Sequence, residues 1–444
     1  WADNRNGDYD IYGTRLVDGG VVDPNGIPIC TASGDQTEPS IAFDGTTYLV
    51  AWTDARAANN LEVYAARVTP GGTVQDVTGF PVSTAAFAAD TAPVVASSGG
   101  RFLVSWQSVG STTASVDVVG RRYAAGSGFL ESQPFAIAAQ AGAQQHAAVA
   151  AGTGEYLVSW DDEGGGVRAA PVAPSGSPAV GASFQIAGPA ADGGVPPTWP
   201  AVAPAPGGYA VAWRQGAIQV ARVSAAGALL EGPMAVSRAP SGGAVPGAPA
   251  VSSNGAQLYA AWSEPVGAWR ELRGARVELD GGVVDPGGLP VLSGEAPVDG
   301  GAPRLRLEAD GVYLAYESTH AALGASRVRM AEVSFDPADP GAPCSLSSDC
   351  GSGFCVSGVC CATACGAGMC STGVCLVTGP GGSDGGAGAD GGAEEEDAGG
   401  AAEIVLVPQA PTLLQVGCSS STASTPAAVM ALLLMALRGC RRRR

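Results

Sequence analysis

Lysine is absent from this chain of 444 residues, and all 23 basic residues are arginine. Charged residues make up only 14% of the sequence, and 41 acidic residues give a formal net charge of −18. The one dense basic run is Arg441–Arg444, at the carboxyl end. A phosphate backbone is bound by clustered positive charge, so this composition argues against a nucleic-acid partner.

Histidine is scarce, with His146 and His320 as the two copies, each isolated in an alanine-rich stretch. Neither lies near a serine or cysteine nucleophile motif, and no G-x-S-x-G, H-E-x-x-H or P-loop pattern occurs. The sequence therefore predicts a chain that is not an enzyme, and it nominates no catalytic or cofactor-binding residue. Carboxylates are plentiful, so a glycoside hydrolase or lyase stays open as the alternative.

Helical periodicity is also lacking before Ser334, where no stretch of ten or more residues shows a clear 3.6-residue period. Glycine (66 residues) and proline (32 residues) are abundant instead, which favours turns and short strands. An apolar run ending in an aromatic residue recurs with spacings of 51, 54, 54, 53, 49 and 54 residues. Such a period is typical of a propeller or a solenoid. The anchors are Trp1, Trp52, Trp106, Trp160, Trp213, Trp262 and Tyr316.

Each repeat holds four short apolar runs, which is the anatomy of a propeller blade. A Pro-led pair such as Pro39–Ile41 precedes the anchor run, and a turn such as Asp44–Gly45 joins the two as a hairpin. The anchor run is apolar at nearly every position, as expected where neighbouring blades cover both of its faces. The fourth run carries proline, which is confined to sheet edges. The sequence therefore predicts an all-β propeller of about seven four-stranded blades over residues 1–335.

The first repeat reads Trp1-Ala-Asp3-Asn-Arg5 and then Asp10-Ile-Tyr-Gly-Thr-Arg15. This pattern resembles the repeats of a bacterial family of exported propeller-type proteins, over about three quarters of the chain. The resemblance implies an architecture and leaves the ligand open. Because the chain opens inside a repeat, we expect the intact protein to extend further at its amino terminus.

Four residues of the first repeat carry oxygens suited to calcium, a hard cation, and they are the one metal candidate. Their spacing does not fit an EF-hand, and only this repeat has all four. The competing interpretation is a capped turn, and no other cofactor is predicted. The four residues are Asp3, Asn6, Asp8 and Asp10.

Eight cysteines are concentrated in a segment with almost no large apolar residues, residues 340–376. An even count at this density predicts disulfide bonds in place of a core, with the pairing left open. Zinc is the alternative, but C-x2-C pairs and a nearby histidine are lacking. The segment resembles short Cys-rich modules of exported myxobacterial proteins. Cys30 lies outside it and is expected to be a buried free thiol. The eight are Cys344, Cys350, Cys355, Cys360, Cys361, Cys365, Cys370 and Cys375.

Residues 377–411 form a linker rich in glycine, alanine and aspartate, and such a composition is expected to stay disordered. Residues 412–444 then combine Gly417–Ser419, the apolar stretch Pro426–Leu437 and terminal arginines. As a helix the apolar stretch would span roughly 18 Å, against a hydrocarbon core of about 30 Å. The arginines are expected on the cytoplasmic side, which places the preceding residues outside the cell.

The order of motif, apolar stretch and basic end resembles the myxobacterial carboxyl-terminal sorting signal MYXO-CTERM. The resemblance implies that Cys418 is the processing and lipid-attachment residue, and that the tail is removed. It also implies an exported lipoprotein at the cell surface or outer membrane. The alternative is a degraded anchor helix that is retained.

The predicted function is binding or adhesion at the cell surface, with the propeller as a rigid platform for a surface glycan or protein ligand. The alternative is an exported propeller enzyme that acts on polysaccharide or peptide. A polar, carboxylate-lined centre of the ring would favour the enzyme, and an apolar centre would favour binding.

Overall fold

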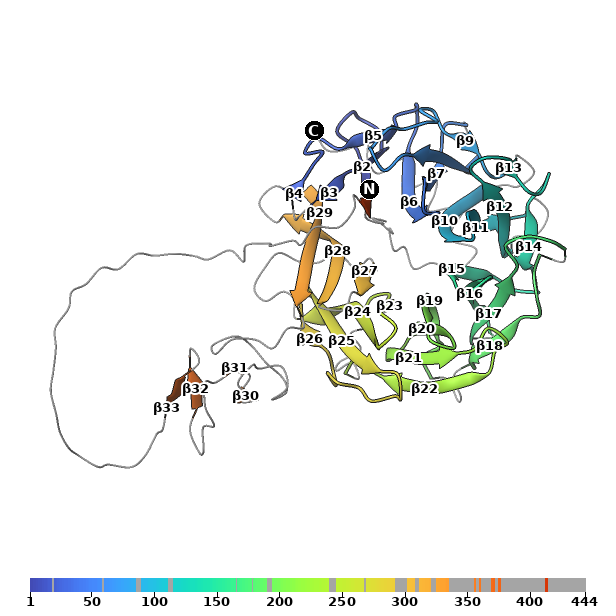
Figure 1. Cartoon of the computed structure of the whole chain (residues 1–444). Helices are drawn as coiled ribbons and strands as arrows, with labels where there is room; N and C mark the ends of the chain where they lie inside the picture. The colour runs from blue at the N-terminus through green and yellow to red at the C-terminus, as the bar shows by residue number, and fades with distance from the viewer. Residues whose placement is uncertain are drawn as a thin grey trace, which may run out of the picture. The chain divides into compact units, whose positions relative to one another are not determined.

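Every regular element in the described part of the chain is a β-strand, and the strands group into sheets around a common centre in the computed structural model (Figure 1). Predictions for the linker, the sorting tail and most of the cysteine cluster lie outside the described residues. Those residues are 1–17, 20–57, 60–84, 89–110, 115–164, 166–177, 179–189, 194–238, 245–266, 269–291, 302–307, 311–320, 325–334, 355–356, 359–360, 369–371, 374–376 and 412–413.

Seven antiparallel sheets form the blades, so the predicted all-β propeller is confirmed. Blade 1 holds β1 (Ala2–Asp3), β2 (Asp10–Gly13) and β5 (Ile27–Cys30). Blade 2 holds β6 (Gln36–Phe43), β7 (Tyr48–Asp54), β8 (Glu62–Val68) and β9 (Phe80–Pro81). Blade 3 holds β10 (Ala89–Ser98), β11 (Arg101–Val109), β12 (Val116–Ala124), β13 (Gly128–Phe129) and β14 (Phe135–Ala138), the last two both paired with β12.

The remaining blades repeat this order, from the inner strand outwards. Blade 4 holds β15 (Gln144–Ala151), β16 (Tyr156–Asp162), β17 (Gly166–Val172) and β18 (Phe184–Ala187). Blade 5 holds β19 (Thr198–Ala205), β20 (Gly208–Gln215), β21 (Ala217–Val223) and β22 (Leu229–Ala235). Blade 6 holds β23 (Ala250–Ser253), β24 (Gln257–Val266), β25 (Trp269–Glu278) and β26 (Leu289–Pro290). Blade 7 holds β27 (Arg304–Leu307), β28 (Gly311–His320) and β29 (Ala325–Ser334).

Shorter strands lie outside the blades. β3 (Arg15–Val17) pairs with both β4 (Gly20–Val21) and β34 (Thr412–Leu413). Within the cysteine cluster, β30 (Cys355–Val356) pairs with β31 (Val359–Cys360), and β32 (Met369–Ser371) pairs with β33 (Val374–Leu376). No helix long and apolar enough to cross a membrane occurs in the described residues.

The second strand of a blade is buried on both faces because side chains alternate along a strand and each face meets a different blade. In β7, Trp52 packs with Ile11 of the preceding blade. Leu49, on the other face of the same strand, packs with Trp106 of the following blade. This explains the continuous apolar sequence of the anchor runs.

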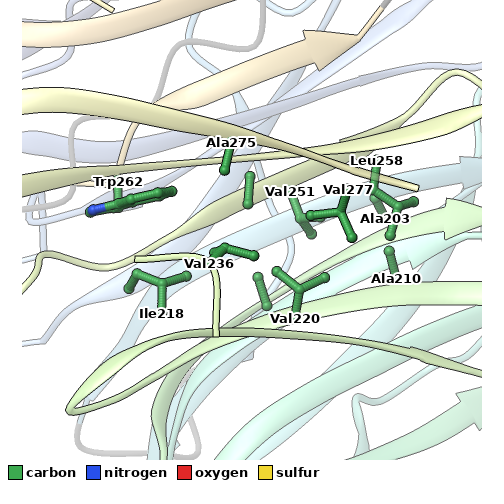
Figure 2. Packing of buried hydrophobic residues seen from close by; sticks show 12 residues of the cluster. Ala203, Ala210, Ile218, Val220, Val236, Val251, Leu258, Trp262, Ala275 and Val277 are labelled. Atoms are coloured by element: carbon green, nitrogen blue, oxygen red, sulfur yellow. The ribbon is translucent and has the colours of Figure 1, made fainter. Parts of the chain in front are cut away.

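The anchor tryptophans fill the seams between blades, as the sequence predicts. Figure 2 shows Trp262 of blade 6 in one cluster with Ile218 and Val236 of blade 5. Full burial of so large a side chain makes each anchor a major contributor to the stability of its seam. The anchors exposed by 1% or less are Trp52, Trp106, Trp160, Trp213 and Trp262.

An arginine–carboxylate pair closes the loop after the third strand in several blades. Arg67 of β8 donates its backbone N–H (3.0 Å) and Nε–H (2.8 Å) to Oδ2 of Asp76, and its Nη2 donates to Oδ1 (2.8 Å). The Arg67 guanidinium holds the pKa of Asp76 below its usual range. The same bonding joins Arg276 to Asp285 in blade 6, so the pair is a structural element of the repeat.

Candidate active site

The inner strands of four successive blades share a β-bulge at the same position. The register with the second strand shifts there in each of the four. The first bulged residue has a positive φ, which a residue other than glycine rarely adopts. Inner strands of adjacent blades contact one another near the centre of the ring (Figure 1). The bulged residues are Glu38 (φ 55°), Ala92 (φ 52°), His146 (φ 50°) and Trp199 (φ 56°).

The bulge frees a backbone N–H, and the preceding blade accepts its hydrogen bond. The Ala92 N–H donates to Oγ1 of Thr53 (3.0 Å) and to Oε2 of Glu38 (2.9 Å). The His146 N–H donates to Oε1 of Gln107 at 3.2 Å. Thr53 and Gln107 each come directly after an anchor tryptophan, so this position joins one blade to the next.

Asp161 occupies the same position in blade 4, and its carboxylate binds the bulged residue of its own blade, as Thr53 does with Glu38 in blade 2 (2.7 Å). Nδ1 of His146 lies 2.8 Å from Oδ1 and 3.0 Å from Oδ2 of Asp161. A carboxylate is an acceptor, so Nδ1 carries the proton in this pair and Nε2 is the basic nitrogen. The His146 side chain is 23% exposed and the Asp161 side chain 12% exposed. The blade thus holds an imidazole in one orientation without burying it.

The His146 ring also stacks on the indole of Trp199, the bulged residue of the next blade. The ring centroids are 3.5 Å apart and the planes meet at 26°. Trp199 is half-buried, whereas the anchor tryptophans of blades 2 to 6 are fully buried. Part of the Trp199 side chain is therefore accessible to solvent.

Two arginines lie next to this group in blades 5 and 6. Arg214 of β20 follows the anchor Trp213, and Arg270 is the second residue of β25, the strand after the next anchor. Burial lowers the pKa of both guanidinium groups; Asp161 opposes the shift of Arg214, and Arg270 adds to it. The two guanidinium groups bond to adjacent carbonyl oxygens, those of Pro246 (3.5 Å) and Val245 (2.9 Å), and Arg214 also bonds to Thr198, the residue before Trp199.

The group offers a base, an aromatic surface and positive charge. A histidine whose Nδ1 is held by a carboxylate is the usual form of a general base, because its Nε2 is aimed and ready to take a proton. An indole surface suits the apolar face of a ring-shaped ligand. Guanidinium groups suit carboxylate or sulfate.

The four calcium candidates of the first repeat form hydrogen bonds with different partners. Asp3 accepts from Arg5 (Nε, 2.9 Å) and from the Trp1 indole (3.2 Å). Asn6 donates to Asp10 at 2.8 Å, and Asp8 accepts from a distant backbone N–H. The structure thus brings two of the four side chains together, and no cluster of three or more metal-ligating residues occurs in the described part of the chain.

The remaining predicted residues lie mostly outside the described part of the chain. Cys418 lies there, as do Cys344, Cys350, Cys361 and Cys365. The backbone pairs Cys355 with Cys360 and Cys370 with Cys375 across two short hairpins. Cys30 is a buried free thiol, as expected, and burial raises its pKa.

This site was not predicted from the sequence, because His146 has no chemical partner close to it along the chain. Asp161 lies 15 residues away and Trp199 lies 53 residues away along the chain. Alignment of the repeats would have given a signal, since His146 and Trp199 fall at the same repeat position. Asp161 likewise falls at the position of Thr53 and Gln107.

No protein-family profile and no curated protein matches this chain. Solved structures do. An arabinanase from Bacillus subtilis shares 11% identity at a TM-score of 0.37, over 68% of this chain and 96% of its own. A sialidase from Trypanosoma rangeli shares 12% identity at a TM-score of 0.43, over 72% of this chain and 59% of its own. An α-L-arabinofuranosidase from Coprinopsis cinerea shares 9% identity at a TM-score of 0.37, over 73% of this chain and 97% of its own.

The prediction that this chain is not an enzyme is therefore corrected. The solved structures that it resembles carry the names of glycan-cleaving enzymes. The physical reason is that folding brings together His146 and Asp161, which lie 15 residues apart in the sequence. At these identities the likeness to solved structures shows the fold alone.

Proposed function

We propose that this chain is an exported enzyme that acts on a polysaccharide near the axis of its propeller, at blades 4 and 5. The carrying observation is the contact of His146 with Asp161 on one side and with Trp199 on the other. The same two repeat positions are bonded in blade 2, where Oγ1 of Thr53 donates to Oε2 of Glu38 at 2.7 Å. In blade 4 they carry an imidazole and a carboxylate instead, and the imidazole also stacks on an indole of the next blade.

The proposed roles follow from the geometry. Asp161 orients the imidazole through Nδ1. Nε2 of His146 takes a proton from the water molecule whose oxygen bonds to the anomeric carbon, the glycosidic C–O bond breaks, and the departing oxygen gains a proton, so that one water is consumed per linkage. Trp199 offers its indole to a sugar ring. Oriented general bases contribute about 10²–10⁴-fold to a rate.

Export and tethering belong to the same proposal. The disulfide-rich module, the linker and processing at Cys418 would hold the propeller at the cell surface, where polysaccharides are met. A single acyl chain binds a membrane only marginally, so stable tethering through Cys418 needs a second signal or chain. Intact-mass analysis of the mature protein tests this part, because recovery of a peptide containing Leu432–Leu437 would contradict processing.

The catalytic proposal is tested by incubating the full chain with a panel of plant and bacterial polysaccharides and measuring released reducing ends. The variants are His146→Ala, Asp161→Asn and Trp199→Ala. Glu155→Gln is the matched control, since Glu155 lies in the turn at the other end of the same hairpin. Thermal unfolding of every variant separates lost activity from lost fold.

We expect a rate reduced by about 10²-fold or more for His146→Ala and Asp161→Asn. Trp199→Ala should raise KM more than it lowers kcat, because a stacking platform acts on binding. The control should retain the parent rate. Full activity of folded His146→Ala on every polysaccharide that the parent cleaves would refute the assignment, as would a parent chain that cleaves none.

A further inference from the structure

Arg214 and Arg270 bind the same short segment of backbone from two blades. Nη1 of Arg214 donates to the carbonyl oxygen of Pro246 (3.5 Å), and Nη2 of Arg270 donates to that of Val245 (2.9 Å). Arg214 also donates to Oγ1 of Thr198, the residue directly before Trp199. The two guanidinium groups are thus fixed beside consecutive carbonyls and next to the proposed sugar platform.

Neither guanidinium forms an ion pair within 4.0 Å among the described residues. The nearby carboxylates are bound elsewhere. Asp161 is bound by His146, and Glu264 accepts from the indole of Trp262 at 2.7 Å. By contrast, Arg67 of the repeated loop pair carries its own aspartate. The two guanidinium groups are therefore bonded to neutral oxygens, and no carboxylate is bound to either of them among the described residues.

We infer that the axial site takes an acidic polysaccharide, and that Arg214 and Arg270 bind the carboxylate or sulfate of a sugar unit beside Trp199. This inference rests on the proposed function and names its substrate class. A guanidinium presents paired N–H groups that match carboxylate and sulfate oxygens, and such charge-assisted hydrogen bonds are about twice as strong as neutral ones.

The overall charge of the chain limits where a polyanion can bind. A net charge of −18 repels a polyanion over the surface as a whole. Binding of an acidic polymer would therefore require a local site, and this pair near the axis provides one.

The test measures equilibrium binding of the full chain to two matched pairs of polymers. Polygalacturonate is compared with fully methyl-esterified pectin, and dextran sulfate with dextran. The two charged polymers distinguish carboxylate from sulfate recognition. The variants are Arg214→Gln and Arg270→Gln. Arg222→Gln is the control, because Arg222 of blade 5 also bonds two carbonyl oxygens, those of Pro206 and Leu279, but does so near the β19–β20 turn, away from the bulge.

We expect at least one charged polymer to bind about tenfold tighter than its neutral partner. Arg214→Gln and Arg270→Gln should each remove most of that preference, while Arg222→Gln keeps it. Equal binding of charged and neutral polymers would overturn the inference, and the proposed function would survive if Trp199→Ala still weakened both. An equal loss in the control would overturn the assignment to this pair. Absence of both binding and cleavage of any glycan would overturn both proposals.

Discussion

The indole Nε1–H of Trp106 donates to Oδ1 of Asp90 on the neighbouring strand at 3.0 Å. In blade 2 the equivalent Trp52 donates instead to Asp54, two residues further along its own strand, at 2.8 Å. Blade 3 has Ser108 at that place, and Ser108 lies directly opposite Asp90 in the strand register. The carboxylate has moved to the facing strand and the buried hydrogen bond is kept.

Asp90→Ala should therefore destabilise the propeller by about 1–3 kcal/mol, because it leaves the Trp106 N–H buried without an acceptor. Chemical denaturation gives the free energy of unfolding. The double variant Asp90→Ala/Ser108→Asp restores the blade 2 arrangement and should recover most of the loss. If the double variant is less stable than the single one, the exchange of positions is not the explanation.

The charge of Asp90 is a separate matter from its hydrogen bond. Burial raises the pKa of Asp90, so its charged form costs stability as the pH rises through that pKa. Asp90→Asn keeps an acceptor oxygen and removes this cost. We expect it to be less destabilising than Asp90→Ala at pH 7, and to lose less stability than the parent between pH 4 and 7. Thermal unfolding at both pH values measures this, and a steeper loss would contradict it.

Gly79 lies against the anchor ring of blade 2, and its φ is +66°. A Cβ at this position would lie 2.6 Å from Cζ2 of the buried Trp52. Gly79→Ala should therefore cost about 2–4 kcal/mol, from overpacking and backbone strain together. Gly45→Ala is the matched control, since Gly45 has a φ of +100° and open space around it, and should cost about 1 kcal/mol. Equal losses would show that the ring contact is unimportant.

The Arg67–Asp76 pair should make stability depend on acid pH. Because Arg67 lowers the pKa of Asp76, the pair stabilises the fold above the ordinary aspartate pKa of about 3.9, and this is lost as the pH falls through the lowered value. Asp76→Asn should therefore lower Tm at pH 6 and have little effect near pH 2. A Tm difference that is constant over this range would contradict the ionic role.

Removal of the side chain that accepts the hydrogen bond between blades should lower the free energy of unfolding more in blade 3 than in blade 2. Thr53→Val leaves the Ala92 N–H with Glu38 as a second acceptor, so the loss should be below about 1 kcal/mol. Gln107→Ala removes the acceptor of the His146 N–H and should cost about 1–3 kcal/mol. It should also lower activity by releasing the backbone that holds the imidazole. Larger destabilisation by Thr53→Val would reverse this interpretation.

The fold was predictable because an aromatic anchor recurs in every blade, and the strand that carries it is buried on both faces, which requires a continuous apolar run such as Tyr48–Trp52. The place of proline was also predictable, because proline cannot donate to a neighbouring strand and Pro81 ends β9, the outer strand of its blade. The site was not predictable from local spacing, because ring geometry joins His146 to Trp199 across two blades. The loop pair of Arg67 and Asp76 was visible as a recurring separation of nine residues, as in Arg276 and Asp285.

At the bulged position the backbone conformation is constant between blades, while the residue type varies. Four blades hold it at nearly the same φ while carrying an acid, a methyl group, an imidazole and an indole. Its conformation thus comes from the strand and from the blade before it, and the side chain has little part in setting it. Combinatorial replacement at Glu38, Ala92, His146 and Trp199 would therefore change which side chains the four inner strands present at one position, while the backbone conformation of the bulge is kept.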